Sequence, residues 1–444
     1  IENVLGSAYA DTFKGNNAVS NIFNGGTSNL AAALNSTTGE YTSDENDKVD
    51  YSSSSSSIVV NLNTNQVVIG GTVTDYLYNI EHIIGTAQDD SFTGNSDNNS
   101  LVGGAGNDTI FAGSGSDTID GGAGDDWLDY TDLASTNVSV NLRNNTATHG
   151  SSTDSITAIE HLRMSNGTNL VQGNQSANSF IGGTGTDTLS YGGAASGVTV
   201  NVTSAGAGTS SGDGLDVFTG FENYTLSSNA DTANLSGVFG STIDGGALSD
   251  TASYSSVAAS LTVTVDSGNT SARVSDGTKT DTLQSIEKII GTDYNDTFYS
   301  DLNGNNTFVG GSQDTLGEDV LDYSHMVVSD ATRDYVYLDL SNSTTTVKQS
   351  NNTTATDSFS EIEKFILTSG NDTIKGNAQA NTFDGGAGSD TARYDYLTAG
   401  ESVVVDFSTS KATTTILNDV DTLINIENAF GSAGNDTFIM NGTD

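Results

Sequence analysis

Hydrophobic residues recur singly at a nine-residue interval over residues 85–129, between polar and glycine-rich stretches. This segment is five nonapeptides end to end, and the eighth position of each is Phe92, Leu101, Ile110, Ile119 or Leu128. The glycines permit tight turns with positive φ, and the last three residues of each repeat suit one very short strand. Because such a unit buries almost nothing alone, the pattern predicts a stack of coils.

A longer repeat contains the nonapeptides and is marked by an Ile-Glu or Phe-Glu pair. Each complete unit holds a D-x-U-x-Y segment (U is apolar), such as Asp126–Tyr130, and then an alternating stretch, such as Val138–Leu142, that predicts a half-buried strand. We expect one continuous all-β solenoid over residues 1–444, as a segment of a longer protein, because no helix or linker interrupts the pattern. The units start near residues 1, 80, 159, 221, 286, 362 and 426.

The spacing of acidic residues predicts which of them share an edge of the solenoid. The step from Asp75 to Asp90 and the slightly longer step from Asp90 to Asp108 are both lengths of one coil. We therefore expect a ladder of carboxylates along one edge. The stretch after D-x-U-x-Y is longer than either step, and we expect it to form one large coil or two small ones.

Residues 103–129 hold three nearly ideal tandem copies of G-G-x-G-x-D-x-U-x, departing only at Ala112. This pattern resembles the hemolysin-type calcium-binding (RTX) repeat. The resemblance implies a right-handed parallel β-roll, in which two nonapeptides make one coil and Ca²⁺ lies between successive turns. Carried onto this chain, it puts Asp90, Asp108 and Asp126 on one edge, and Asn99 and Asp117 on the other.

The resemblance also implies the calcium ligands, which are Asp carboxylates and turn carbonyls. Calcium takes six to eight oxygen ligands, which these groups supply. The alternative for each Asp is that it caps backbone amides in a glycine-rich turn. The implied metal positions are Asp90, Gly103, Gly104, Gly106, Asp108, Gly113, Gly115, Asp117, Gly121, Gly122, Gly124, Asp126, Asp187, Asp296, Asp372, Gly385, Asp390 and Asp436.

Other positions of the repeat leave alternatives open. The turns before Asp250 and Asp319 are irregular, and calcium and plain turn readings are equally favoured there. Asn169, Asn178 and Asn381 replace the carboxylate, giving a weaker site or an amide ladder without an ion. The glutamates of the Ile-Glu and Phe-Glu pairs either add a further carboxylate to the edge sites or face solvent on the strand. We favour the solvent-facing position. The tyrosines of D-x-U-x-Y are predicted to pack in half-buried strands.

The net charge of the chain limits the kinds of partner that it can bind. The chain has 56 Asp and Glu against 13 Lys and Arg, a formal net charge of −43, so it repels itself unless cations neutralise it. The charge argues against a nucleic-acid partner, because phosphate binding needs Lys and Arg. The absence of Cys excludes disulfides and thiolate metal sites. No apolar run reaches the roughly 18 residues of a transmembrane segment.

Motifs for catalysis are absent. No H-E-x-x-H occurs, and Gly208–Gly212 fits G-x-S-x-G only by letter, without a strand–turn–helix context. We therefore expect no enzyme activity. Members of the resembling family are commonly exported by type I secretion from Gram-negative bacteria. The resemblance thus favours a calcium-dependent structural protein outside the cell, in a surface layer, a filament or an adhesin stalk.

Such a protein should self-associate or attach to a cell-surface glycan or protein of a bacterium. The alternative is an RTX-bearing secreted enzyme, a hydrolase or a polysaccharide-modifying enzyme, with its catalytic part outside this segment or in a solenoid groove. In sequence, a carboxylate pair for glycoside hydrolysis would look the same as a calcium ladder.

Overall fold

The computed structural model describes residues 2–7, 9–15, 19–26, 47–266, 271–301, 305–312, 318–326, 328–331, 334–349, 353–415, 418–440 and 442. These residues form 46 β-strands and one short 3₁₀ helix, η1 (Thr131–Leu133). They group into two compact units: unit 1 is Ile1–Ala194 with Ala205–Tyr224, and unit 2 is Ala195–Ser204 with Thr225–Asp444. One continuous solenoid over residues 1–444 stays a prediction. No helix in the described ranges is long and apolar enough to span a membrane.

The strands of unit 1 are β1 (Glu2–Leu5), β2 (Thr12–Lys14), β3 (Asn21–Asn24), β4 (Lys48–Asp50), β5 (Ile58–Asn61), β6 (Gln66–Ile69), β7 (Val73–Tyr78), β8 (His82–Ile84), β9 (Ser91–Thr93), β10 (Ser100–Ala105), β11 (Thr109–Phe111), β12 (Thr118–Ala123), β13 (Trp127–Asp129), β14 (Val138–Asn141), β15 (Thr146–His149), β16 (Ser152–Thr157), β17 (His161–Arg163), β18 (Leu170–Gln172), β19 (Ser179–Ile181), β20 (Thr188–Ser190), β22 (Ala207–Ser211) and β23 (Val217–Thr219). The strand β24 (Asn223–Thr225) spans the division between the units.

The strands of unit 2 are β21 (Thr199–Ser204), β25 (Thr232–Leu235), β26 (Thr242–Asp244), β27 (Thr251–Ser253), β28 (Thr262–Val265), β29 (Ser271–Ser275), β30 (Thr280–Gln284), β31 (Lys288–Ile290), β32 (Thr297–Tyr299), β33 (Thr307–Val309), β34 (Val320–Asp322), β35 (Tyr335–Asp339), β36 (Thr344–Lys348), β37 (Thr354–Ser360), β38 (Lys364–Ile366), β39 (Thr373–Lys375), β40 (Thr382–Asp384), β41 (Thr391–Arg393), β42 (Val403–Asp406), β43 (Lys411–Thr414), β44 (Val420–Ile424), β45 (Asn428–Phe430) and β46 (Thr437–Ile439).

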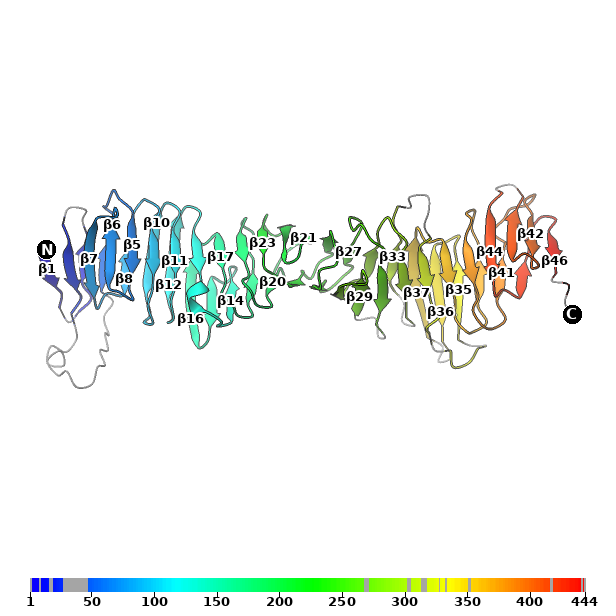
Figure 1. Ribbon diagram of the computed structural model, residues 1–444, viewed down its shortest axis with the longest axis horizontal. Helices are drawn as coiled ribbons and strands as arrows, with labels where there is room; N and C mark the ends of the chain where they lie inside the picture. Colours follow the sequence, from blue (N-terminus) through cyan, green and yellow to red (C-terminus); the bar gives the residue numbers. More distant parts are fainter. Residues whose placement is uncertain are drawn as a thin grey trace. The chain divides into compact units, whose positions relative to one another are not determined.

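The nonapeptide strands of unit 1 stack in parallel, alternating between two sheets (Figure 1). In one sheet β9, β11 and β13 are neighbours, with Phe92, Ile110 and Leu128 in register. In the other sheet β10 pairs with β12, and Leu101 lies opposite Ile119. Each residue thus pairs with the one two repeats later, which confirms that two nonapeptides make one coil.

Single apolar side chains form the core between the two sheets. Most of the three-residue strands bury their middle residue, and many leave both flanks less buried, as in β9, β11 and β19. Ile110, Ile119 and Leu128 are 0% exposed. Full burial of such a side chain contributes about 1.5–3 kcal/mol, and it requires the next coil. The predicted all-β parallel solenoid is confirmed.

The stretch after D-x-U-x-Y makes one large coil, since β13 pairs directly with β17, but it contains an antiparallel hairpin that the sequence did not predict. β15 pairs antiparallel with both β14 and β16. The two outer strands keep parallel neighbours, β14 with β18 and β16 with β12. The return turn places Asn145 at φ 56°, a left-handed conformation that Asn tolerates. Further meanders of this kind are β5–β6–β7, β28–β29–β30, β35–β36–β37 and β42–β43–β44.

These hairpins separate acidic residues that their spacing in the sequence placed together. Asp75 lies on β7 and Asp90 immediately precedes β9, but β6 and β5 stand between those two strands in the sheet. The prediction that the step from Asp75 to Asp90 is a rung of one ladder is therefore wrong. The step from Asp90 to Asp108 does join adjacent strands.

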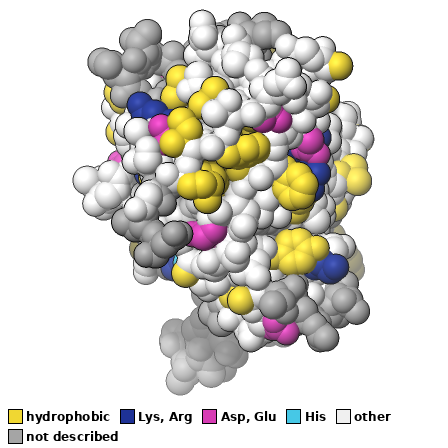
Figure 2. All heavy atoms as spheres, turned by 90° about the vertical axis from the view of Figure 1, so that its right-hand side faces the viewer, with side chains coloured by type: hydrophobic (Ala, Val, Ile, Leu, Met, Phe, Trp, Pro, Cys, Tyr) yellow, Lys and Arg dark blue, Asp and Glu magenta, His cyan; other side chains and the backbone are white. Residues whose placement is uncertain are grey.

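Strands β45 and β46 of unit 2 leave hydrophobic side chains exposed. Phe430 is 59% exposed, Phe438 45%, Ile439 42% and Met440 67%. Figure 2, in which the right-hand side of Figure 1 faces the viewer, shows hydrophobic side chains on this face. Among the described residues, β46 has only β42 as a neighbour, so half of the packing that buries a coil is missing there.

Candidate metal centres

A ladder of carboxylates links successive turns on one edge of unit 1. The N–H of Asp90 donates to Oδ1 of Asp108 at 2.7 Å, and the N–H of Asp108 donates to Oδ1 of Asp126 at 2.7 Å. The N–H of Asp126 donates to Oε2 of Glu160 at 3.0 Å. Each acid thus caps the backbone of the coil before it, and the predicted edge of Asp90, Asp108 and Asp126 is confirmed.

The opposite edge carries a second ladder. The N–H of Asn99 donates to Oδ1 of Asp117 at 2.7 Å, and the N–H of Asp117 donates to Oδ1 of Asp154 at 2.9 Å. Asp117 therefore lies between Asp108 and Asp126 in sequence but on the other edge in space, as predicted. Asp154, the last acid of this ladder, was absent from the predicted site.

The glutamates of the Ile-Glu and Phe-Glu pairs end the ladders, so the favoured solvent-facing interpretation is wrong. Oε2 of Glu160 accepts the N–H of Asp126, the D-x-U-x-Y aspartate of the preceding unit, and the same contact recurs along the chain. The separation of the two residues ranges from 34 to 44 positions, and this irregularity hid the pairing in the sequence. The further pairs are Asp47 with Glu81, Asp187 with Glu222, Asp250 with Glu287, Asp319 with Glu363 and Asp390 with Glu427.

In one class of turn, the second carboxylate oxygen of the Asp has no partner. This Oδ2 atom is buried and makes no hydrogen bond with any residue that the structure describes. A buried charge without a partner is costly, which marks a place that a cation would fill. We call these the open carboxylates; they are Asp108, Asp117, Asp126, Asp187, Asp250 and Asp390.

Burial dominates the titration of the open carboxylates. It raises the pKa of Asp108 and Asp117 to about 7 and that of Asp187 to about 6. Neighbouring carboxylates add to the effect, as Asp90 and Asp126 do for Asp108, whereas the accepted backbone hydrogen bond opposes it. A cation beside Oδ2 would lower these pKa values again.

Backbone oxygens converge near the open carboxylates. A Cβ atom on Gly103 would lie 2.1 Å from Oδ2 of Asp108 and 2.4 Å from the carbonyl oxygen of Gly121. A Cβ on Gly121 would lie 2.7 Å from Oδ2 of Asp126 and 2.0 Å from the carbonyl oxygen of Ala158. Gly385 has the same surroundings beside Asp390. Only glycine fits between these oxygens.

The remaining predicted glycines shape the same turns. Gly104, Gly106, Gly113, Gly115, Gly122 and Gly124 all have φ between 85° and 150°. A Cβ on Gly122 would lie 2.1 Å from the carbonyl oxygen of Gly104, one coil earlier. Within the described ranges no group of three or more His, Asp or Glu side chains could hold a metal. Carbonyl oxygens would therefore supply most ligands, which suits Ca²⁺, a hard cation that accepts them.

The family model of the RTX calcium-binding nonapeptide repeat matches this chain in four places, at residues 79–110, 93–128, 165–195 and 363–392. These matches contain five of the six open carboxylates, all except Asp250. The chain carries RTX calcium-binding repeats. No curated protein matches the chain.

In another class of turn the RTX-type aspartate is fully satisfied by the chain itself. The N–H of Thr86 donates to Oδ2 of Asp90 at 2.6 Å, and its hydroxyl donates to Oδ1 at 3.1 Å. We call these the closed carboxylates; they are Asp11, Asp90, Asp231, Asp296, Asp372 and Asp436. Four of the predicted metal positions, Asp90, Asp296, Asp372 and Asp436, are in this class. Calcium binding at these four residues stays a prediction, because their Oδ2 atoms already accept hydrogen bonds from the chain.

The acids that close each repeat unit are satisfied by buried tyrosines. The hydroxyl of Tyr394 donates to Oδ2 of Asp421 at 2.9 Å, and Tyr394 is 0% exposed. The tyrosines therefore pack as predicted but also bind an acid that sequence reasoning did not pair with them. The recurring order of Tyr and closing Asp in each unit was the available signal. The other pairs are Tyr51 with Asp75, Tyr130 with Asp154, Tyr191 with Asp216, Tyr254 with Asp281 and Tyr323 with Asp357.

Replacing Tyr394 by Phe should destabilise unit 2 even in saturating calcium. The change leaves Oδ2 of the buried Asp421 without its donor, which costs about 1–3 kcal/mol. Tyr396→Phe is the matched control, because the buried Tyr396 hydroxyl has no hydrogen-bond partner among the described residues. Urea unfolding of the two variants with calcium present measures the difference. Equal stability of the two would show that the Tyr394–Asp421 bond contributes nothing.

Proposed function

We propose that this chain is an extracellular, calcium-dependent structural protein of a bacterial cell surface. One observation carries the proposal: buried carboxylate oxygens without partners recur in both units, at Asp108, Asp117, Asp126 and Asp187 in unit 1 and at Asp250 and Asp390 in unit 2. Such oxygens are tolerable in a folded chain when a cation neutralises them. Calcium is abundant outside cells, where a chain with a net charge of −43 would find it.

A structural role is supported by the way the repeats occupy the described chain. The ladder of backbone N–H and carboxylate recurs from Asp47 and Glu81 in unit 1 to Asp390 and Glu427 in unit 2. The N–H of the aspartate in one coil thus donates to an acid of the next coil at both ends of this range. Solenoids built this way present long, regular surfaces, which suits a surface layer, a filament or an adhesin stalk.

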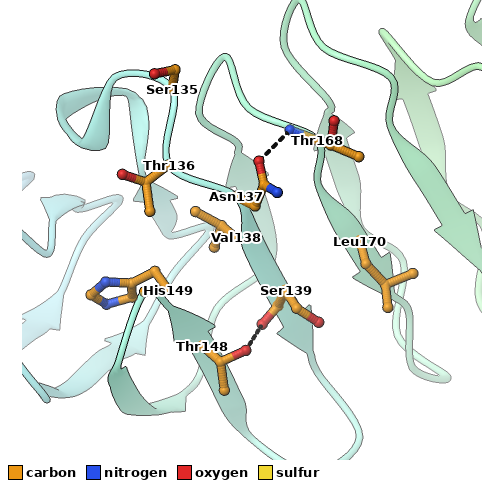
Figure 3. Close-up of a pocket in the computed structure, with 10 residues that line it drawn as sticks. Ser135, Thr136, Asn137, Val138, Ser139, Thr148, His149, Thr168 and Leu170 are labelled. Carbon is orange, nitrogen blue, oxygen red and sulfur yellow. Dashed lines mark hydrogen bonds between the residues drawn. The ribbon is translucent and has the colours of Figure 1, made fainter.

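The character of one cavity in unit 1 supports a non-catalytic role. It has a volume of about 550 Å³ and contains Ser, Thr and Asn side chains, with no carboxylate among its lining residues. Figure 3 shows Asn137 and Thr168 joined by a hydrogen bond, and Thr148 bonded to the backbone of Ser139. His149 contributes to the wall, but its Nε2 lies 3.0 Å from Oδ2 of the buried Asp154. The His149 imidazole is therefore engaged in a structural contact with a buried acid.

Cell-surface location can be tested with antibodies against this chain on intact cells of the producing bacterium. We expect labelling of unpermeabilised cells, and loss of that labelling after a wash with EGTA. A wash with EGTA plus excess Ca²⁺ is the control and should leave the labelling unchanged. Labelling that requires permeabilised cells would contradict the proposed function.

A further inference from the structure

Open and closed carboxylates differ at one position of the turn, four residues before the aspartate. All six open turns have a glycine there with positive φ: Gly104, Gly113, Gly122, Gly183, Gly246 and Gly386. The six closed turns have a hydroxyl residue instead: Ser7, Thr86, Ser227, Thr292, Thr368 and Ser432. No other turn position separates the two classes so cleanly, since the third glycine of the motif is absent before the open Asp250.

The closed turn shows how the hydroxyl residue replaces a cation. In the turn ending at Asp372, the N–H of Thr368 donates to Oδ2 at 2.8 Å, and the hydroxyl donates to the same oxygen at 2.8 Å. The hydroxyl oxygen accepts the N–H of Gly370 at 2.9 Å. Two hydrogen atoms thus point at the oxygen that an ion would contact. In the same way, a hydroxyl oxygen accepts the backbone N–H of the residue two positions later in the turns of Thr86, Ser227, Thr292 and Ser432.

The open turn cannot adopt this arrangement, because its backbone is different. Gly386, four residues before Asp390, has φ 87°. A side chain there would be strained, and its Cβ would lie 2.0 Å from the carbonyl oxygen of Thr368. In this conformation the N–H of Gly386 donates to Oδ1 of Asp384, so it is not available to Asp390. The residue type therefore selects one of two exclusive turns.

At three of the six open turns, those of Gly104, Gly246 and Gly386, a closed turn is the neighbour one coil earlier. There the carbonyl oxygen of the hydroxyl residue in the closed turn faces the glycine of the open turn. A Cβ on Gly104 would lie 2.1 Å from the carbonyl oxygen of Thr86, and one on Gly246 would lie 2.1 Å from that of Ser227. Closed and open carboxylates are also joined directly, as in the hydrogen bond from Asp372 to Asp390 at 2.7 Å.

We propose that the residue four positions before the turn aspartate determines whether the turn binds Ca²⁺. Glycine leaves Oδ2 open to the ion, whereas serine or threonine fills the ion's place with an amide and a hydroxyl hydrogen. The proposal rests on the proposed calcium function. It removes Asp90, Asp296, Asp372 and Asp436 from the calcium sites and assigns them a calcium-independent role, in which they join coils whether or not the ion is present.

The substitution Thr368→Gly tests the proposal by a gain of binding. It converts the turn Leu367–Asp372 to L-G-S-G-N-D, which matches A-G-S-G-S-D of the open turn Ala112–Asp117. Isothermal titration of the whole chain with Ca²⁺, checked by elemental analysis after dialysis, should give one more ion per chain than wild type. Thr368→Val is the matched control; it removes the hydroxyl but keeps the backbone conformation and N–H, so it should add none.

Thr86→Gly provides an independent variant in unit 1. It gives G-G-A-Q-D-D, close to the open G-G-A-L-S-D turn of Asp250, and it should also add one ion. If the wild-type chain binds Ca²⁺ but neither glycine variant binds an added ion, the proposal is overturned and the calcium function still stands. An added ion in Thr368→Val would also overturn the proposal, because the backbone would then not be decisive. A wild-type chain that binds no Ca²⁺ would overturn both.

Discussion

Removing calcium at pH 8 should unfold most of unit 1. Its open carboxylates, Asp108, Asp117, Asp126 and Asp187, would be charged and buried without partners. A ligand at 100 times its dissociation constant stabilises a folded chain by about 2.7 kcal/mol per site, so four sites contribute about 11 kcal/mol. The whole stability of a domain is about 5–15 kcal/mol. Folding and calcium binding should therefore be coupled.

Far-UV circular dichroism measures this coupling directly. The strand signal should be lost in EGTA and return with millimolar Ca²⁺. Millimolar Mg²⁺ is the control and should not restore it, because Mg²⁺ demands a smaller octahedral shell and keeps its waters. A strand signal that is the same in EGTA and in calcium would refute the coupling.

Lowering the pH from 8 to 5 should stabilise the calcium-free chain. Burial raises the pKa of Asp108, Asp117, Asp250 and Asp390 to about 7, whereas an unfolded Asp titrates near 3.9. The folded state therefore binds more protons in this range, and its stability rises as the pH falls through 7. Protonation removes the uncompensated charge that calcium would otherwise neutralise.

Calcium should reverse this pH dependence. Protons compete with Ca²⁺ for the open carboxylates, so the affinity for calcium should fall as the pH drops below 7. Urea midpoints measured at pH 5 and pH 8, each with EGTA and with Ca²⁺, test both directions. A calcium-free chain that is less stable at pH 5 than at pH 8 would contradict the burial of ionised carboxylates.

The coil could be predicted from sequence because its signals are local and periodic. The apolar residues Ile110 and Leu128 stand two nonapeptides apart and pair in register, and Asp108 and Asp126 follow the same step. The hairpin could not be predicted, because the alternation of Val138–Asn141 suits a parallel coil and an antiparallel strand equally. Periodicity gives the faces of a strand but not its partner.

The ends of the ladders were missed for a different reason. Glu160 and Asp126 are 34 residues apart, and Tyr394 and Asp421 are 27 apart. Hairpins lie inside both intervals, and their lengths vary between repeat units. No constant spacing therefore marks these pairs, although the residue types recur in every complete unit.

The turn before Asp250 shows which glycine of the motif matters. Because its sequence lacks the third glycine, a calcium-binding turn and a turn without an ion were equally favoured predictions. In the structure Leu248 occupies that position at φ 75°, and Asp250 remains open. A bulky residue is strained in this region, so the turn keeps its geometry at a cost. The second glycine, Gly246, is the feature that it shares with every open turn.

The central claim is that calcium contacts the open carboxylates, and a crystal grown in Ca²⁺ tests it most directly. Anomalous difference maps at long wavelength should place ions about 2.3–2.6 Å from Oδ2 of Asp108 and Asp126 on one edge, and of Asp117 on the other. Asp372 and Asp436 should have no ion at Oδ2. Empty positions at the open oxygens in saturating calcium, or ions bound equally at the closed ones, would contradict the account.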